Sequence, residues 1–394
     1  MTIKQGVSFV MNKLTLKAVI LSVIGLGLLL PSLDAAKSNV LYKDQVAVIM
    51  YHHVDDDAKS GGTITTKLFQ DQLTLLKKKG YQFITLRQFK DYMQGASVPN
   101  NAVLVTFDDG YESFYVNAYP ILKSMRIPAV NFVITNDLEN PLASYIPSMS
   151  RDDIIEMTSD TNFIDAQCHT HNFHYKLPDG NAALIGRMVN NGKRETDEEY
   201  KQRVITDTQA CVAKLAELYP EPIDSYAYPY GIYDKTSIGY IHEGGMNYAF
   251  TVVPEMVTRQ LDPMQLPRIN AGNSAISPEG LDTSIMRRVV APNPPSTEVP
   301  LIETMNQLGG KAALSSGGHV SIQYQTLQWS GSVNSSKLTS LSAKPPISIQ
   351  KPLYMKNNKL YIALKDLETV IGSQIVYNPN VQSFSVQQSP TVKK

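Results

Sequence analysis

Short apolar runs alternate with amphipathic stretches through residues 46–290. Strands of a parallel sheet are covered on both faces, so they read as continuous apolar runs rather than as strict alternation. Six segments have this character, and we expect strands at 46–50, 103–107, 129–134, 163–168, 225–228 and 248–252.

The stretches between these runs have helical spacing. Phe69, Leu73 and Leu76 share one face of a helix that should end near Gly80, and a second helix is expected over 197–218. Repeated alternation of strands and helices predicts an α/β fold. We expect a (β/α) barrel that is distorted or incomplete.

Several prolines in residues 291–296 mark a boundary, because proline continues neither a helix nor a central strand. Beyond it, two passages resemble each other, each a helix-like stretch (301–307 and 364–370) followed by a hairpin-like pair of strands. We therefore expect a main domain over 36–290, a linker over 291–300 and a small duplicated α+β module over 301–388. Residues 330–346, rich in Ser, Lys and Pro, should form a loop between the copies.

The first 35 residues have the composition of a secretory signal peptide. Lys13 and Lys17 precede an apolar run over 18–30, and Leu33 and Ala35 would occupy positions −3 and −1 of a cleavage site. An uncleaved membrane anchor is the alternative, although the run is shorter than the roughly 20 residues that span a bilayer. Both interpretations predict a secreted or extracytoplasmic protein, with membrane or wall association left open.

The charge and cysteine content limit which binding partners and which covalent cross-links we expect. Lys+Arg and Asp+Glu number 36 each, so the formal net charge is zero. Nucleic-acid binding needs a basic face, and we expect no nucleic-acid partner.

A disulfide between Cys168 and Cys211 is permitted outside the cytoplasm, but two cysteines make no disulfide framework. We expect two buried free thiols, one on a strand and one on a helix.

Two carboxylates follow the predicted strand at 103–107 directly. Adjacent side chains at a strand end point in different directions, so Asp108 and Asp109 can serve different roles, and Gly110 permits a sharp turn. Taken alone, the same three residues are also typical of a solvated turn.

Three of the seven histidines, His169, His171 and His174, follow the strand at 163–168. Imidazole is the commonest neutral metal ligand, and two imidazoles with one carboxylate make an open metal site. A satisfied polar loop is the alternative, but short His-rich tracts often bind metal.

Three further motifs lie near strand ends. His52 and His53 end the first strand, Tyr230 lies in a Pro-Tyr-Gly turn, and Arg268 lies in a late Leu-Pro-Arg motif. The turn can aim a backbone N–H into a cleft and place an aromatic wall beside a sugar. Each motif alone would be structural.

Together these motifs resemble, in order and content, the polysaccharide deacetylase (NodB-like) family over roughly residues 46–275. They are most similar to the branch that contains the poly-N-acetylglucosamine deacetylases of biofilm formation. Thr-Phe-Asp-Asp-Gly at 106–110 and His-Thr-x-x-x-His at 169–174 are the most specific parts. The resemblance implies a metal-dependent hydrolase that removes N-acetyl groups from an amino-sugar polysaccharide of the cell wall or extracellular matrix.

The resemblance also implies the metal ligands. Asp109, His169 and His174 would hold one divalent ion, with positions left for water and the acetyl oxygen. Zinc is the default for this donor set, and nickel, cobalt and iron are alternatives. His171 points elsewhere if its loop is extended, so we leave it out of the ligand set.

Four further residues receive catalytic roles from the resemblance. Asp108 would be the general base for the attacking water, with Arg268 against it, and the backbone N–H of Tyr230 would stabilise the oxyanion. The wider family has an Arg where Ala227 stands and a late Leu-x-His that this sequence lacks before residue 291. In the similar branch the acid is the histidine of the first motif, here His52, which leaves His53 structural.

The C-terminal module and the substrate are less defined. The second copy resembles, over about 40 residues, a stalk-like domain of some copper amine oxidases, which implies a spacer or cell-wall attachment and no copper chemistry. The acetylated polysaccharide could be poly-N-acetylglucosamine, peptidoglycan, chitin or a plant polymer. A catalytically inactive wall- or glycan-binding protein, or a deacetylase of another, O-acetylated polymer, are the alternative functions.

Overall fold

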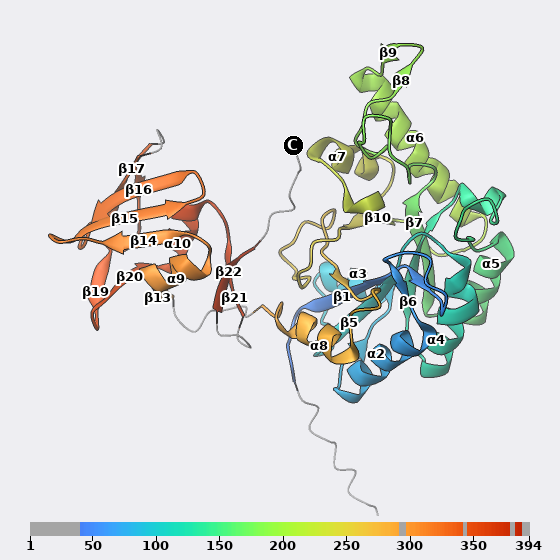
Figure 1. Cartoon of the computed structure of the whole chain (residues 1–394), viewed down its shortest axis with the longest axis horizontal. Coiled ribbons are helices and arrows are strands. Elements are labelled where there is room, and N and C mark those ends of the chain that lie inside the picture. The colour runs from blue at the N-terminus through green and yellow to red at the C-terminus, as the bar shows by residue number, and fades with distance from the viewer. Residues whose placement is uncertain (1–39, 291–296, 342–344, 379–382, 388–394) are drawn as a thin grey trace, which may run out of the picture. The chain divides into compact units, whose positions relative to one another are not determined.

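The structure is a computed structural model that describes residues 40–290, 297–341, 345–378 and 383–387 (Figure 1). The predicted signal segment and residues 291–296 of the predicted linker lie outside this part of the chain. Within it, no helix has both the length and the apolar character needed to span a membrane.

A curled parallel sheet forms the main domain (Figure 1). Its strands follow the order β11-β10-β7-β6-β5-β1-β12, with β4 also paired to β5, and every pair is parallel. The order ends at β11 and β12, and between them only a single parallel bridge joins Phe250 to Leu266 within the described residues. The predicted distorted or incomplete (β/α) barrel is confirmed. The strands of this sheet are β1 (Val46–Tyr51), β4 (Gln82–Phe83), β5 (Ala102–Phe107), β6 (Ala129–Ile134), β7 (Ile164–Thr170), β10 (Ser225–Ala227), β11 (Tyr248–Phe250) and β12 (Ile269–Asn270).

Alternate residues of each strand enter two different cores, because successive side chains of a strand point to opposite faces. Val48, Leu104 and Phe132 belong to the core inside the curl. Ile49 and Val105, their neighbours in sequence, pack with the surrounding helices. Those helices are α2 (Thr66–Lys78), α4 (Tyr119–Met125), α5 (Arg151–Asp160), α6 (Asp197–Ala216), α7 (Lys235–Glu243) and α8 (Pro278–Met286). Helix α3 (Leu86–Met93) instead packs in the same core as Val48.

Helix α6 is the longest of the described helices, and its sequence explains where it starts. The Thr196 side chain accepts from the backbone N–H of Glu199, and the Glu199 side chain accepts from the backbone N–H of Thr196. This capping box satisfies two of the backbone donors that every helix start leaves open. The buried face of α6, which includes Val204, Asp207 and Cys211, packs on β7.

The C-terminal module has a single core of its own. The predicted helices are present as α9 (Leu301–Gln307) and α10 (Leu364–Ile371), and each is followed by an antiparallel hairpin. Side chains of both copies enter the same core, and Trp329 Nε1 donates to the carbonyl of Val370 in α10 at 2.9 Å. The two predicted copies therefore share one core.

Part of the loop that we expected over 330–346 is instead strand, because β16 and β17 extend the sheet of the first copy. Strand β13 likewise occupies the last three residues of the predicted linker. The strands of the module are β13 (Glu298–Pro300), β14 (Lys311–Leu314), β15 (His319–Tyr324), β16 (Leu327–Ser332), β17 (Lys337–Ser340), β18 (Ile347–Ser348), β19 (Tyr354–Lys356), β20 (Lys359–Ala363), β21 (Ile375–Asn378) and β22 (Ser383–Val386).

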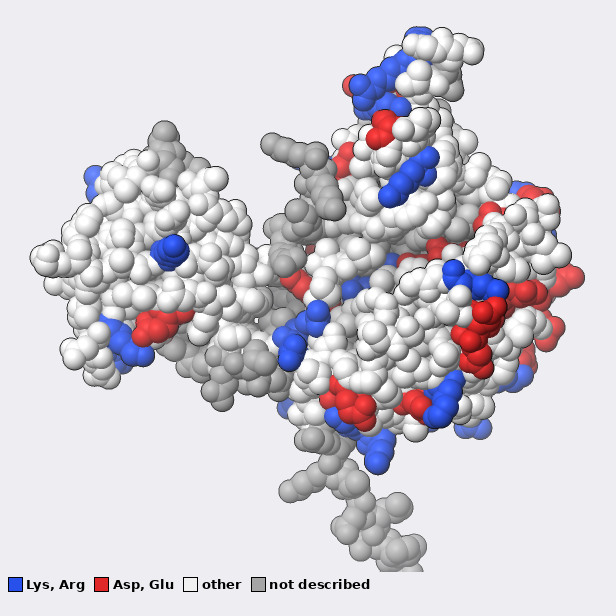
Figure 2. All heavy atoms as spheres, viewed as in Figure 1, with Lys and Arg blue, Asp and Glu red and all other residues white. Residues whose placement is uncertain are grey.

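The surface of the main domain carries charges of both signs, interspersed on the face that Figure 2 shows. Several are paired: Arg151 Nη2 lies 2.7 Å from Glu217 Oε2, and Lys214 Nζ lies 2.5 Å from Glu139 Oε1. This mixture agrees with the zero formal net charge of the sequence.

Candidate active site

The end of β5 places one carboxylate inside the barrel. Phe107 packs in the outer core, so the next residue, Asp108, faces inward, where it is 3% exposed. Arg268, the residue before β12, is fully buried and forms two parallel contacts with it: Nη1 to Oδ1 at 2.6 Å and Nη2 to Oδ2 at 2.7 Å. Arg268 Nε also donates to the carbonyl of Thr251 at 2.9 Å. A buried guanidinium thus compensates the buried carboxylate.

This pairing sets the charge of Asp108. Burial acts to raise the pKa of its carboxyl, but the charge and the hydrogen bonds of Arg268 outweigh burial and lower the pKa below its ordinary value. His52 Nε2 lies 3.9 Å from Asp108 Oδ2, and the His52 side chain is 30% exposed. The ionised Asp108 therefore lies between an enclosed arginine and a histidine that reaches solvent.

Asp109 and Gly110 turn the chain sharply. Both have positive φ, 74° and 71°. Aspartate tolerates this left-handed conformation better than most residues, and glycine adopts it without cost. A Cβ on Gly110 would also lie 3.1 Å from Cγ1 of Val133, so space as well as conformation favours glycine. The turn brings Asp109 Oδ1 to 3.3 Å from Nε2 of both His169 and His174.

Asp109, His169 and His174 form the only group of three or more candidate metal donors among the described residues. Their donor atoms all lie within 4.8 Å of one another, and Asp109 Oδ1 is buried without a hydrogen-bond partner in that part of the chain. An unpartnered buried carboxylate oxygen is costly, and a cation between the three donors would satisfy it. The residues present therefore fit one divalent ion.

The orientation of His169 and the pKa of His174 also suit a metal. His169 Nδ1 donates to the carbonyl of Ala227 at 2.8 Å, which orients Nε2 of this ring toward Asp109. Burial, assisted by the nearby His169, lowers the pKa of His174 to about 4, so this imidazole is neutral at neutral pH. Burial acts to raise the pKa of Asp109, but the adjacent imidazoles lower it below its ordinary value.

Tyr230 lies at the mouth of the site, in the turn that follows β10. It has a φ of 58°, and its ring, 40% exposed, stacks on His174 with 4.4 Å between ring centroids and 29° between planes. A Cβ on the next residue, Gly231, would collide with the side chain of Val252. The predicted aromatic wall therefore lies directly on a candidate ligand.

The two remaining histidines of these motifs lie outside the donor group. His53 is buried, with Nδ1 3.1 Å from Oγ1 of Thr63. His171 turns to the other side of β7, where its Nδ1 lies 3.0 Å from Oγ1 of Thr135.

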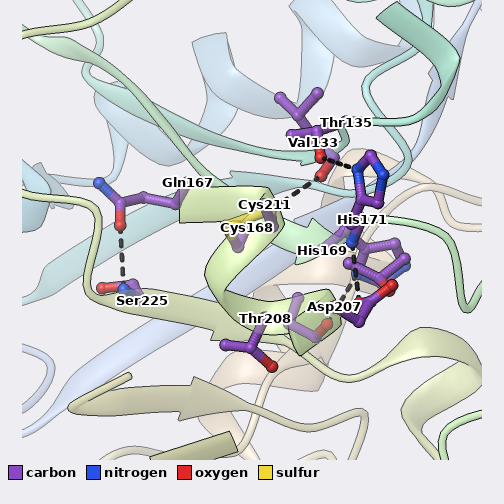
Figure 3. Close-up of a disulfide and its surroundings, with 12 residues drawn as sticks. Val133, Thr135, Gln167, Cys168, His169, His171, Asp207, Thr208, Cys211 and Ser225 are labelled. Carbon is purple, nitrogen blue, oxygen red and sulfur yellow. Dashed lines mark hydrogen bonds between the residues drawn. A yellow bond between two sulfur atoms is a disulfide. The ribbon is translucent and has the colours of Figure 1, made fainter. Parts of the chain in front are cut away.

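The cysteines are not free thiols. Cys168 of β7 and Cys211 of α6 form a disulfide, with 6.0 Å between their Cα atoms (Figure 3). Our expectation of two free thiols was wrong, because it considered their number and the separate elements that carry them but not how those elements pack. Packing of α6 on the outer face of β7 brings together two residues that are 43 positions apart.

Two polar residues near the site, Asp207 and Tyr111, were not predicted from the sequence. Asp207 in α6 accepts hydrogen bonds from the segment that joins His169 to His174. Tyr111 follows the Asp-Asp-Gly turn, and burial, then the charge of Asp109, raises its pKa. A carboxylate on the apolar face of a predicted helix is the signal that could have revealed Asp207.

Comparison with known proteins points to one family. Residues 95–249 match the family described as polysaccharide deacetylase. Over 213 residues the chain is 29% identical to the poly-beta-1,6-N-acetyl-D-glucosamine N-deacetylase of Staphylococcus epidermidis, which covers 54% of this chain and 69% of that protein. The corresponding protein of Staphylococcus aureus strain N315 is 27% identical with the same coverage.

Solved structures share the fold. IcaB from Ammonifex degensii is 26% identical and superposes with a TM-score of 0.53, over 62% of this chain and 97% of that one. The de-N-acetylase from Aggregatibacter actinomycetemcomitans, at 23% identity and a TM-score of 0.55 over 61% and 100%, has the same fold. The family match, the relatives and the parallel barrel together identify a polysaccharide deacetylase domain over residues 95–249.

Proposed function

We propose that this protein removes N-acetyl groups from poly-β-1,6-N-acetylglucosamine outside the cytoplasm. The observation that carries the proposal is the convergence of three donor atoms, within 4.8 Å of one another, beside a carboxylate that a buried arginine keeps ionised. The substrate is taken from the staphylococcal relatives, which are named for this polymer.

Asp109, His169 and His174 would hold the ion, and zinc is the metal that we propose. Two imidazoles and a carboxylate suit zinc, and the three-residue set leaves coordination positions free, as catalytic zinc sites do. When bound, the ion would polarise the acetyl carbonyl and lower the pKa of a water molecule. Nickel, cobalt and iron accept the same donors.

The other side chains divide the proton transfers. Asp108 would accept a proton from the attacking water, and the double contact with Arg268 would hold its carboxylate in position. His52, on the solvent side of Asp108, would donate a proton to the leaving amine, which is too basic to leave as an anion. The backbone N–H of Tyr230 would stabilise the oxyanion.

Location outside the cytoplasm is part of the proposal. The disulfide supports it, because stable disulfides form in oxidising compartments. The signal-like composition of residues 1–35 supports it as well. We further propose that the C-terminal module is a spacer or attaches the enzyme to the cell wall.

The test measures amine release from soluble β-1,6-N-acetylglucosamine oligomers, with and without a chelator. We expect the chelator to abolish release and zinc to restore it. His174→Ala should lose both ion binding and activity, whereas the matched variant His171→Ala should keep both, because its ring contacts Thr135 instead of the donor group.

The alternatives give different results in the same assay. A glycan-binding protein without activity would bind the oligomers and release no amine. A deacetylase of another polymer would release acetate only from O-acetylated glycans. Loss of ion binding in His171→Ala but not in His174→Ala would contradict the proposed ligand set.

A further inference from the structure

The last residues of β7 point alternately to two sides of the sheet. His169 points inward, toward Asp109. The residues on either side of it both contact α6 on the outer side. Cys168 forms the disulfide with Cys211 (Figure 3), and Thr170 donates a hydrogen bond of 2.7 Å to Asp207. A proposed metal ligand thus lies between two points of attachment to one helix.

Asp207 accepts three hydrogen bonds from this segment. Its Oδ2 accepts from Thr170 Oγ1 at 2.7 Å and from the backbone N–H of His171 at 3.0 Å, and its Oδ1 accepts from the backbone N–H of Asn172 at 2.7 Å. Thr170 Oγ1 in turn accepts from the backbone N–H of Phe173 at 2.9 Å. Every residue from 170 to 173 is therefore connected to one carboxylate, directly or through Thr170.

The attachments come from one face of α6. Arg203, Asp207 and Cys211 are spaced four residues apart, so they lie above one another on the helix. The Arg203 guanidinium lies 4.9 Å from the ring centroid of Phe173, the residue before His174. Asp207 is 6% exposed, and its carboxylate faces the segment between the two histidines rather than the metal donors.

We propose that Asp207 is a positioning residue, which, together with the Cys168–Cys211 disulfide, fixes the separation of His169 and His174 and so sets the affinity for the divalent ion. This inference rests on the proposed metal centre. An ion binds most tightly when its ligands are already held in place, because binding then costs little ordering of the chain. Partners that orient ligands typically contribute 10- to 100-fold in metal affinity.

The experiment measures the dissociation constants for Zn²⁺ and Co²⁺, by chelator competition, in the full chain and in Asp207→Asn, Asp207→Ala and Asp207→Glu. Asparagine replaces one acceptor oxygen by a donor that faces another donor, so we expect affinity to fall by about 10- to 100-fold. Glutamate keeps both oxygens and should recover part of this loss. The visible spectrum of bound Co²⁺ should change in the asparagine variant, because the ligand geometry changes.

The matched control is Asp165→Asn. Asp165 lies on the same strand, is partly buried and accepts from Tyr219 Oη at 2.8 Å, but it lies at the opposite end of β7. This control should lower the melting temperature of the metal-free protein without changing ion affinity. If the alanine variant of Asp207 fails to fold, Thr170→Val removes the hydroxyl that links Asp207 to Phe173 with little change in shape. We expect weaker ion binding from it too.

The outcomes separate the two proposals. Unchanged affinity and an unchanged Co²⁺ spectrum in Asp207→Asn and Thr170→Val would show that Asp207 only stabilises the fold, and would overturn this inference. Failure of the unaltered protein to bind either ion would overturn the metal centre itself, and this inference with it.

Discussion

The two strand ends that build the site are held in place by different means. At the end of β5, Asp108 is held by a charge, that of Arg268, which lies 160 residues later in the sequence. At the end of β7, the histidines are neighbours of residues attached to α6 through a disulfide and a buried carboxylate. A buried carboxylate needs a compensating charge, whereas a neutral imidazole needs only to be oriented. The difference predicts which substitutions impair catalysis and which impair ion binding.

The largest effect should come from Asp108→Asn. Without the base, kcat/KM should fall by roughly 10²–10⁴-fold, about 3–5 kcal/mol in activation free energy. Ion affinity should stay normal, because Asp108 is outside the donor group. Amine-release kinetics and chelator competition on the same sample check both, with Asp165→Asn as the control for loss of a partly buried carboxylate. A large fall in ion affinity would show that the two strand ends are not separable.

Removal of the remote charge should mainly affect stability. Arg268→Ala leaves Asp108 buried without its partner, and we expect the free energy of unfolding to fall by about 3–5 kcal/mol. Arg268→Lys keeps the charge but not the paired contact, so its loss should be smaller. Urea unfolding of the metal-free protein measures both. Equal stability of Arg268→Ala and the unaltered protein would contradict the assigned ion pair.

Removal of the disulfide tests the attachment of α6 to the end of β7. The double substitution Cys168→Ala/Cys211→Ala should lower the free energy of unfolding by about 2–4 kcal/mol, because the unfolded chain loses a cross-link. It should also weaken ion binding, which Arg268→Lys should not do. Equal changes of ion affinity in the cysteine double variant and in Arg268→Lys would contradict the different roles of the two strand ends.

The smallest effect concerns the pH dependence of the metal-free protein. The pKa of His174 is about 4 in the folded chain and 6.5 ordinarily, so between these values the unfolded chain binds a proton that the folded chain does not. This contribution is complete above about pH 6.5 and is lost as the pH falls toward 4, to a total of up to about 3 kcal/mol. His174→Gln should flatten this part of the stability curve, measured by urea unfolding with a chelator present. An unchanged slope would contradict the shifted pKa.

Much of the main domain could be predicted from the sequence, because buried parallel strands have an unmistakable apolar pattern. All six expected strands are present, and the motif residues at their ends converge because the carboxyl ends of parallel strands share one edge. Ala227 stands where the wider family has an arginine. Here Arg268, the residue before β12, contacts the Asp108 carboxylate instead.

What could not be predicted depends on packing between distant elements. Neither the disulfide nor the role of Asp207 follows from spacing, since both require that α6 lie on the outer face of β7. The end of β7 was placed at residue 168, two residues early, because a histidine and a threonine do not continue an apolar run. In the C-terminal module, β16 and β17 are each partly exposed, so their polar composition resembled that of a loop.

The position of Arg268 has a consequence for how the enzyme is made. Ribosomes extend a chain from its N-terminus, so β5 and Asp108 are complete long before the residue that neutralises them. Until Arg268 is present, burial of the Asp108 carboxylate would leave a charge without a partner. This cost disfavours burial of the end of β5 in the incomplete chain. The last strand of the sheet to be synthesised, β12, follows Arg268 immediately. Pairing of β12 with β1 and neutralisation of Asp108 are therefore linked, and incomplete chains ending before residue 268 can reach neither.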